Sequence, residues 1–562
     1  MIQIFLDIAV MALRMLLPIY AVTVVYLCYS SMRQQRRDTH PLIALEDVVT
    51  GKVYPVLFWE NSIGRARGSD ILIDDERVSR EHCVLLRRTD GWFISDTNSK
   101  SGTMVNGEEI EYRERVLIDD EITIGGTTLV LKRCSDYRIN RKKSWFYNGE
   151  RPKITIKPYK LMILITVFLM LMSVTACFTT EVTDYVPVKI CGIYVVICWI
   201  FFFVSTVIIC RRNFELEALA LLLSGIGINL LVRQSERQAI VQMVACCIGI
   251  IGFLIIIWFM SDPDRSNRFR TLIMIGAVGL LAVNLVFGTT QYGSTNWIQI
   301  GSLTVQPSEF VKIAFIIVGA SALDKLQTNT NLLQFIIFSA ICVGALALMG
   351  DFGTALIFFA TFLLMAFMRS GDFKTVILAV VSAVFAGAIV LKFKPYVASR
   401  FSSWGHVWEF AQEGTYQQAR VLTYSASGGM FGVGVGNGCL KYIFASESDL
   451  VFGIMTEEMG IIVALAVVAG IVGLVFYARA ITTLSRSTAY SISACCAAGL
   501  LVIQAGLNIF GATDILPLTG VTLPFISLGG SSIISCWGLL ALIKSADERT
   551  YNNKYGGEVF YQ

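Results

Sequence analysis

Apolar runs of about 17 to 25 residues recur along most of this chain, and each is long enough to cross a bilayer as a helix. One run lies within residues 1–31, and about twelve more follow Lys160. Because 55% of the residues are hydrophobic and only 16% are charged, we expect a polytopic α-helical membrane protein with about 13 transmembrane helices. The later runs cover residues 160–179, 187–210, 214–232, 238–260, 270–288, 307–323, 332–350, 353–369, 374–393, 450–478, 488–511 and 523–545.

The basic residues are concentrated in a few connections, and their placement predicts the orientation of the chain. The first run is too long for a signal-peptide core and precedes the basic stretch Ser31–Arg37, so residues 1–31 are expected to remain as an anchor with a cytoplasmic C-terminal end. The basic linker, residues 136–159, favours the same side and suits contact with anionic membrane lipids. Alternation of the spans then places the tail, residues 547–562, in the cytoplasm. The exceptions are basic residues that this topology puts on the outer side: Arg233, Arg237, Lys392, Lys394 and Arg400.

The remaining composition adds little to this assignment. Most of the 14 Cys residues lie inside apolar runs, so we expect buried, small apolar side chains and no disulfide framework. The net charge is only +4, and we expect no nucleic-acid partner.

Residues 50–135 show a different pattern, in which short β-branched or aromatic segments alternate with Gly, Asp, Asn and Ser turns. This pattern is typical of a small, soluble all-β sandwich inserted between membrane segments. The turns contain, in order, Gly64-Arg65, Ser79-Arg80-Glu81-His82, Asp96–Thr103 and Asn106-Gly107. With this order and spacing, about Pro55–Arg133 resembles the forkhead-associated (FHA) domain.

That resemblance implies binding of phosphothreonine peptides. A guanidinium and a hydroxyl on neighbouring loops suit a phosphate dianion, and the resemblance places Gly64 and His82 where they brace these loops. Family members usually carry Asn at the position of Ser101. The alternative is a sandwich that only packs against a partner. The implied phosphothreonine-binding residues are Arg65, Ser79, Arg80 and Ser101.

In the predicted topology, nearly every polar segment that is unusual for a membrane protein falls on the outer side. One such segment is Asn296–Lys312, where Glu309 and Lys312 lie three residues apart on a helix that begins at Pro307. Both side chains therefore face the same way and are expected to pair. The pair is either purely structural or part of an outward-facing cavity. The candidate cavity residues of this segment are Trp297, Gln306, Glu309 and Lys312.

Two aspartates stand at predicted helix starts on the same side. Asp351 is expected mainly as a helix cap and is also a candidate cavity residue. Asp449 lies below a large outer loop and is either a cap or a general base whose proton affinity is tuned by partial burial. In that loop the Gly-rich stretch 416–438 can pack closely against a ligand or a helix, while Arg400 and Arg420 suit contact with a pyrophosphate.

A further outer segment, residues 516–532, is rich in prolines and hydroxyl groups. Pro524 breaks a helix at membrane depth, which is tolerated only where protein or a water-filled cavity lines the break. Pro524 and Ser527 are therefore also candidate cavity residues.

These segments together resemble the SEDS family (shape, elongation, division and sporulation), whose members include RodA, FtsW and SpoVE. The resemblance implies the SEDS fold for a core of residues 213–546, with two additional transmembrane helices in residues 160–212. The chain departs from the family pattern at Asn296, where Arg is common, and at Ala445 and Glu447, where the family has Glu and His. The matching segments are NWIQIG, QPSEFVK, DFGTAL, the Gly-rich stretch, SDLVFGIMTEEMG and NIFGATDILPLTGVTLPFISLGGSS.

The family resemblance implies a peptidoglycan glycosyltransferase that polymerises lipid II with inversion, at the outer face of the bacterial cytoplasmic membrane. It places the essential acid of the family at Asp449, as the catalytic general base. Arg400, Arg420 or Lys312 would stabilise the leaving pyrophosphate. No cofactor or protein-held metal is implied with certainty, and the pyrophosphate leaves room for a divalent cation.

The implied partners are lipid II, a class B penicillin-binding protein and a phosphothreonine-containing protein that regulates the enzyme through the FHA domain. Two other functions fit parts of the sequence: a flippase for lipid-linked cell-wall precursors, and a signalling receptor with a catalytically inactive membrane part. The gathering of charged residues at one face favours the enzyme.

Overall fold

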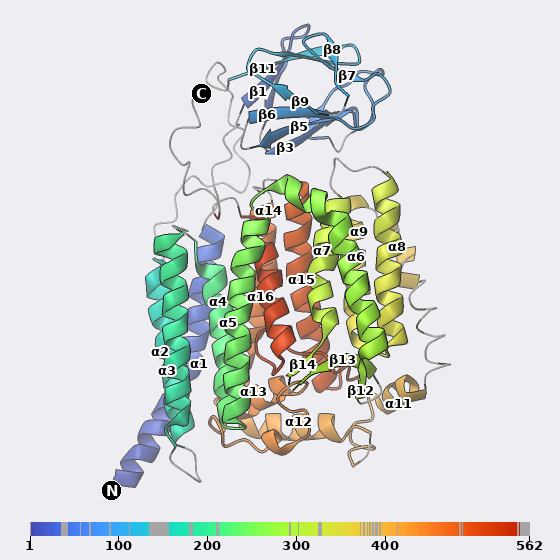
Figure 1. Cartoon of the computed structure of the whole chain (residues 1–562). Helices are drawn as coiled ribbons and strands as arrows, with labels where there is room; N and C mark the ends of the chain where they lie inside the picture. The colour runs from blue at the N-terminus through green and yellow to red at the C-terminus, as the bar shows by residue number, and fades with distance from the viewer. Residues whose placement is uncertain are drawn as a thin grey trace.

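The computed structural model describes residues 2–34, 43–133, 157–178, 184–209, 213–547 and 550, apart from residues 57, 67–68, 89–90, 112, 292–293, 302, 324–328, 413, 483–484 and 486 and many positions between 371 and 394. Two parts are visible in Figure 1: a bundle of long helices, called the helical body here, and a β-sandwich above one end of it. We call that end of the body the sandwich face and the opposite end the far face. The chain begins at the far face, and α1 (Ile2–Gln34) runs from there towards the sandwich.

Among the described residues, ten helices are long and apolar enough to cross a membrane, which confirms a multi-pass membrane protein. The predicted span 374–393 lies largely outside the described residues. The apolar helix α4 (Glu215–Val232) is buried along its whole length, as expected for a helix that is hydrophobic all round. Besides α1 and α4, the long helices are α2 (Pro158–Cys177), α3 (Val186–Phe203, continued by a π-helix to Ile208), α5 (Glu236–Phe259), α6 (Pro263–Phe287), α8 (Asn329–Leu348), α9 (Phe352–Ser370), α14 (Ile461–Thr482) and α15 (Thr488–Ala512). Two shorter helices are α7 (Pro307–Ala322) and α16 (Gly530–Ser545).

The far face is built from short elements that lie outside the long helices (Figure 1). A three-stranded antiparallel sheet turns at Gly301, which has a φ of +64°. The sequence prediction treated this stretch only as a polar wall and missed the sheet, although alternating side chains and a Gly turn are hairpin signals. The far-face elements are β12 (Thr289–Gln291), β13 (Ser294–Ile300), β14 (Leu303–Val305), α11 (Pro395–Ser403), α12 (Tyr416–Gly428), a 3-10 turn (Leu440–Tyr442) and α13 (Val451–Met459).

One predicted span, residues 450–478, is not a single helix. The helix α13 ends at Gly460, whose φ is +86°, and α14 starts afresh at Ile461. A Cβ at Gly460 would lie 2.2 Å from the carbonyl oxygen of Met430, so only glycine fits where the Gly-rich stretch packs against this junction. The prediction was wrong here because the apolar residues on both sides of Thr456–Glu458 were read as one continuous span.

The β-sandwich prediction is confirmed, with two sheets in the orders β2-β1-β11-β10-β7-β8 and β4-β3-β5-β6-β9. Strand β1 precedes the predicted start at residue 50 and pairs with both β2 and β11. Buried aliphatic side chains from both sheets form one core. The strands are β1 (Ile43–Asp47), β2 (Val53–Val56), β3 (Glu60–Gly64), β4 (Ile71–Leu72), β5 (Cys83–Arg88), β6 (Gly91–Asp96), β7 (Thr103–Val105), β8 (Glu108–Glu109), β9 (Arg113–Val116), β10 (Glu121–Ile124) and β11 (Thr127–Lys132).

The sequence analysis did not anticipate a buried ion pair where α4 starts and α16 ends. Lys544 Nζ lies 2.8 Å from Glu217 Oε2, and both side chains are fully buried. Lys544 also donates to the carbonyl of Asn213, whose amide donates to Asp547. These bonds fasten the last helix to α4, so not every buried charge gathers at the far face.

Candidate active site and phosphate site

The predicted phosphate residues lie together at one end of the sandwich, because two of its loops are paired. The amide of Arg65 donates to the carbonyl of Ser79, and the amide of Ala66 donates to the carbonyl of Arg80, both at 3.0 Å. A Cβ at Gly64 would lie 2.3 Å from the Arg80 carbonyl oxygen, so glycine is required for this approach. The side chains of Arg65 and Arg80 are both exposed, one on each of the two paired loops.

A buried histidine joins these loops to a third loop. His82 is fully buried, and its Nδ1 accepts a hydrogen bond from the amide of Ser79. Its Nε2 therefore carries the proton and donates to the carbonyl of Gly102 at 3.0 Å. Ser79 Oγ accepts from the amide of Lys100, and Ser101 Oγ donates to the carbonyl of Arg77. The structure thus brings all four predicted phosphate residues to one end, with the hydrogen of the Ser79 hydroxyl left to donate.

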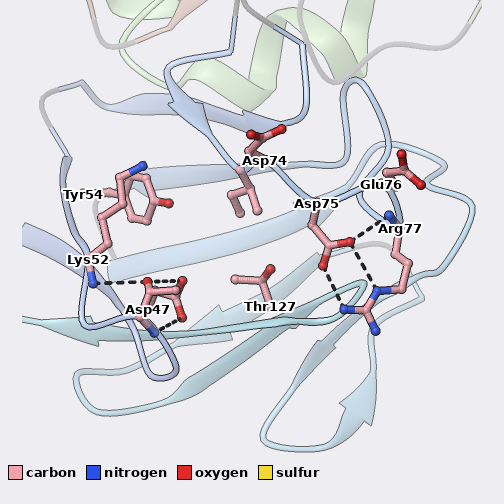
Figure 2. A pocket seen from close by; sticks show the side chains of 10 residues that line it. Asp47, Lys52, Tyr54, Asp74, Asp75, Glu76, Arg77 and Thr127 are labelled. Atoms are coloured by element: carbon pink, nitrogen blue, oxygen red, sulfur yellow. Dashed lines mark hydrogen bonds and ion pairs between the residues drawn. The ribbon is translucent and has the colours of Figure 1, made fainter.

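A cavity of about 700 Å³ lies next to this end, and Figure 2 shows that acidic side chains line much of it. Arg77 points to Asp75 there, with Nη2 3.1 Å from Oδ2, and these hydrogen bonds lower the pKa of the Asp75 carboxyl. Such a lining repels an anion, so the predicted phosphate site is assigned to the surface of Arg65 and Ser79 and not to this cavity. The lining residues are Asp47, Thr50, Lys52, Tyr54, Ile73, Asp74, Asp75, Glu76, Arg77 and Thr127.

At the far face, the backbone around Asp449 is held at three successive carbonyl groups. The Glu447 carbonyl accepts from the amide of Leu528 at 2.9 Å. The Ser448 carbonyl accepts from Ser527 Oγ, and the Asp449 carbonyl accepts from Asn508 Nδ2 at 2.9 Å. The predicted cavity residue Ser527 therefore acts on the backbone that carries Asp449.

The Asp449 side chain is partly buried, and burial raises the pKa of its carboxyl despite a hydrogen bond from Ser448 and the positive charge of Arg400. A Cβ at Gly520 would lie 3.5 Å from Asp449 Oδ2, so glycine keeps this side of the carboxylate open. The Arg400 guanidinium donates to the Leu518 carbonyl at 3.0 Å, which anchors it to the same segment. The structure thus brings Arg400 close enough to Asp449 for their charges to interact.

The predicted Glu309–Lys312 ion pair is present and enclosed. Lys312 Nζ lies 2.7 Å from Glu309 Oε1, with the two side chains 1% and 5% exposed. Ser535 Oγ donates to the other oxygen of Glu309. Lys312 Nζ also donates to Gln504 Oε1 at 3.0 Å. Because its partners surround it, Lys312 belongs to the support of the site.

The helix α15 links this ion pair to Asp449. Gln504 accepts from Lys312 and donates to the Thr522 carbonyl, and Asn508, one turn further, donates to the carbonyls of both Asp449 and Val521. The sequence analysis did not identify Gln504 as a site residue. Two amides spaced four apart in an otherwise apolar run are the signal that would have revealed this face.

A second carboxylate, Asp351, lies at the start of α9 and bonds to residues of the segment Asn296–Lys312. Asp351 Oδ1 accepts from the amide of Thr354, which is the predicted cap. Its Oδ2 accepts from Asn296 Nδ2 at 2.9 Å and from Gln306 Nε2 at 3.1 Å. Asn296, where the family often has Arg, thus fixes Asp351 to the strand that carries the partly buried Trp297.

The remaining candidates lie around this centre. Pro524 is buried in the break between α15 and α16, next to Phe525 with a φ of +66°. The guanidinium of Arg420 lies 5.1 Å from the centre of the Tyr416 ring. Among the described residues, no ion pair joins Arg420 to Asp449.

The Gly-rich stretch packs against a helix, one of the two roles left open by the sequence. Glu457 on α13 accepts from the amides of Cys439 and Leu440, and Glu458 accepts from the amide of Gly436. Burial raises the pKa of the Glu458 carboxyl to about 7. These bonds hold the outer loop over α13. In the described part of the chain, no group of three or more His, Cys, Asp or Glu side chains is arranged to hold a metal ion.

The position of Asn508 leads to a first prediction. Replacing Asn508 by Leu removes both donated hydrogen bonds, and about 1.5–3 kcal/mol of lost positioning corresponds to a rate decrease of roughly 10- to 100-fold. Initial rates of glycan-strand formation at saturating substrate measure this effect. Ser493→Ala is the control, because Ser493 lies on the same helix and bonds only its local carbonyl. Equal rates for Asn508→Leu and wild type would exclude a positioning role.

Family models match two parts of the chain. Residues 221–552 match the FtsW, RodA and SpoVE family of cell cycle proteins, and residues 61–125 match the FHA domain. The first match covers more than half of the chain and includes every predicted residue of the far-face site.

Individual proteins agree with the family match. The chain is 31% identical over 358 residues to the probable peptidoglycan glycosyltransferase FtsW of Saccharophagus degradans, covering 59% of this chain and 92% of that protein. It is 28% identical to the protein with the same description from Bacillus subtilis, covering 54% and 79%. A chain in a solved peptidoglycan synthase complex aligns with a TM-score of 0.51 and 21% identity, covering 61% of this chain and 99% of that one, which supports the fold alone.

Proposed function

Because the chain belongs to the FtsW/RodA/SpoVE family of cell cycle proteins, we propose that this peptidoglycan glycosyltransferase polymerises lipid II at the outer face of the bacterial cytoplasmic membrane. The observation that carries the proposal is the partly buried carboxyl of Asp449 at the far face, where Asn508 and Ser527 hold the backbone that carries it. Polymerisation of purified lipid II by the wild type and by Asp449→Asn is the direct test.

In the proposed reaction, Asp449 takes the proton from the 4-hydroxyl of the acceptor sugar. The oxygen of that hydroxyl forms a bond to the anomeric carbon of the donor, and the bond from this carbon to the pyrophosphate oxygen breaks, with inversion. A raised pKa makes Asp449 a better proton acceptor than an ordinary carboxylate, provided that the pH keeps it ionised. In the proposed reaction, Arg400 stabilises the negative charge of the departing pyrophosphate, because its positive charge acts on Asp449 and its guanidinium bonds the Leu518 carbonyl.

The proposed orientation puts the sandwich in the cytoplasm and the far face outside. The basic stretch after α1 and the basic linker support it. One of the exceptions noted in the sequence, Arg233, has an explanation, because its guanidinium lies 3.3 Å from Asp184 Oδ2 in an ion pair that reduces the weight of its charge.

A class B penicillin-binding protein is the proposed partner for cross-linking the new strands. The similar fold within a peptidoglycan synthase complex supports such an assembly.

The FHA domain is proposed to bind a phosphothreonine-containing protein and so to regulate the synthase. The support is the arrangement of Arg65 and Ser79 on paired loops, with His82 beneath them. Arg80 and Ser101 lie at the rim of the same surface.

The phosphate site gives a second prediction, for peptides in which one phosphothreonine stands among randomised residues. We expect Arg65→Ala to weaken binding of this peptide pool by about 10- to 100-fold, since charge-assisted hydrogen bonds contribute about 1.5–3 kcal/mol. Ser79→Ala should weaken it less. Fluorescence anisotropy of the labelled pool measures both effects.

The control is Arg77→Ala, because Arg77 is an equally exposed arginine that points to Asp75 at the neighbouring cavity. Loss of binding in the Arg77 variant with retention in the Arg65 variant would contradict the site. Equal binding of the unphosphorylated pool would contradict phosphate recognition itself.

A further inference from the structure

The FHA domain contacts the helical body through a closed cluster of four charged residues. Arg88 Nη2 lies 3.2 Å from Glu60 Oε1 and 3.7 Å from Asp264 Oδ1. Arg113 Nη1 lies 3.1 Å from Asp264 Oδ2. We call these four residues, Glu60, Arg88, Arg113 and Asp264, the clamp. Its two positive and two negative charges balance, and the side chains of Glu60 and Arg88 are only 3% and 9% exposed.

On the body side, the clamp acts on the first turns of two helices. Asp264 lies in the first turn of α6, and its own amide donates to the N-cap Asp262. Glu60 Oε2 accepts from the amide of Thr488, the first residue of α15, at 2.7 Å. A carboxylate at a helix start satisfies an amide that has no partner within the helix and interacts favourably with the helix dipole. The FHA domain therefore supplies part of the N-terminal capping of α15.

On the sandwich side, the strands that carry the clamp also carry the phosphate loops. Strand β3 starts with Glu60 and is followed directly by Arg65. Strand β5 ends with Arg88 and is preceded directly by the loop with Ser79. Five extended residues span about 17 Å, so the clamp and the phosphate site are the two ends of the same paired strands.

The third strand of the clamp leads to the same place. Arg113 on β9 pairs with Ser95, and β6 continues from Ser95 into the loop that carries Ser101. The three clamp residues of the sandwich thus lie on one hydrogen-bonded sheet, whose strands lead directly into the phosphate loops. A shift of these loops on peptide binding is therefore transmitted to the clamp through the sheet.

The helix α15 extends the connection to the far face. From Thr488, which bonds Glu60 of the clamp, the helix rises about 30 Å to Asn508 beside Asp449 and passes Gln504 beside the ion pair. One rigid element is thus held by the FHA domain at its start and holds the proposed catalytic residue near its end.

From this geometry we propose that the clamp couples the phosphate site to the glycosyltransferase site, so that binding of a phosphothreonine peptide changes the polymerisation rate through the start of α15. The inference rests on the proposed phosphothreonine binding and names its route of regulation. The clamp lies about 17 Å along the strands from the phosphate loops, so its residues are positioning residues for the response and not for the reaction itself.

The test uses the full chain in nanodiscs and the phosphothreonine peptide pool defined above, with its unphosphorylated counterpart. For the wild type we expect the phosphorylated pool to change the lipid II polymerisation rate at least twofold and to change hydrogen exchange in the first turn of α15. Asp264→Asn should bind the pool as tightly as the wild type, keep its basal rate within twofold, and lose both responses. Asp264→Glu, which keeps the charge, should restore them.

The matched control is Asp262→Asn, two residues away, because Asn is as good an N-cap as Asp and Asp262 is not in the clamp. Binding of the pool without any rate change in the wild type, or equal responses in the wild type and Asp264→Asn, would overturn the coupling while leaving phosphothreonine binding intact. Failure of the wild type to bind the pool would overturn both proposals. Each result is therefore assigned to one proposal or to both.

Discussion

Replacing Asp449 by Asn is expected to reduce lipid II polymerisation by a factor of about 100 to 10,000, the range that a general base contributes. Asn has nearly the same shape but cannot take a proton at neutral pH. The backbone that carries residue 449 is held by Asn508, Ser527 and Leu528, so the variant should fold like the wild type. Gel separation of the glycan strands, with initial rates, measures the loss.

The pH dependence adds a second readout of the same substitution. A base acts only when ionised, and burial raises the pKa of Asp449, so the wild-type rate should fall with decreasing pH through a pKa above the ordinary aspartate value. The residual rate of Asp449→Asn should lack this acidic limb. The control is Asp514→Asn, also on the far face, whose φ of +59° is one that Asn readily adopts. Wild-type activity in Asp449→Asn would remove the proposed base.

Much of the membrane architecture follows from the sequence alone, because crossing a bilayer imposes a length and a composition on each helix. Most predicted spans agree with the observed helices to within a few residues. The failure at residues 450–478 has a specific cause: the break at Gly460 is made by contact with Met430 in a distant loop. The position of the break is set by this tertiary contact, and its mark in the sequence is the polar group Thr456–Glu458 just before Gly460.

The candidate site was less predictable than the fold. Single unusual residues, such as Asp449 and the Glu309–Lys312 pair, were visible because charge is costly in a membrane. Their connections were not visible, because Gln504 and Asn508 are neutral and lie in an apolar run. Arg420 stays a prediction, since the contact that the structure shows for its guanidinium is a local one with Tyr416.

The interdomain clamp was also beyond the sequence analysis. Glu60, Arg88 and Arg113 look like ordinary surface charges of a small sandwich, and only the docked arrangement shows that they meet Asp264. The resemblance to two separate families identifies each part, but it carries no information about the contact between them.

The buried ion pair at the far face gives the second large expected effect. Lys312→Met leaves the Glu309 carboxylate enclosed without its counter-charge, which costs about 3–5 kcal/mol of stability. We expect a markedly lower Tm in detergent and loss of polymerisation, since Gln504 also loses the partner that fixes it beside Thr522. Differential scanning fluorimetry and the strand assay measure the two effects.

The double variant Glu309→Gln with Lys312→Met separates the structural role of the pair from a chemical one. Gln can still bond Ser535 and carries no charge, so the double variant should regain most of the lost Tm, because replacing both members of a buried pair is far less costly than removing one. If Lys312 only supports the site, as its enclosure by Glu309 and Gln504 indicates, about a tenth or more of the wild-type rate should return with the fold. A double variant with a restored Tm and no polymerisation would instead assign the ammonium group to the charge that develops on the pyrophosphate. The enclosed geometry argues against that outcome, because Lys312 is 1% exposed and two of its three hydrogens already have acceptors.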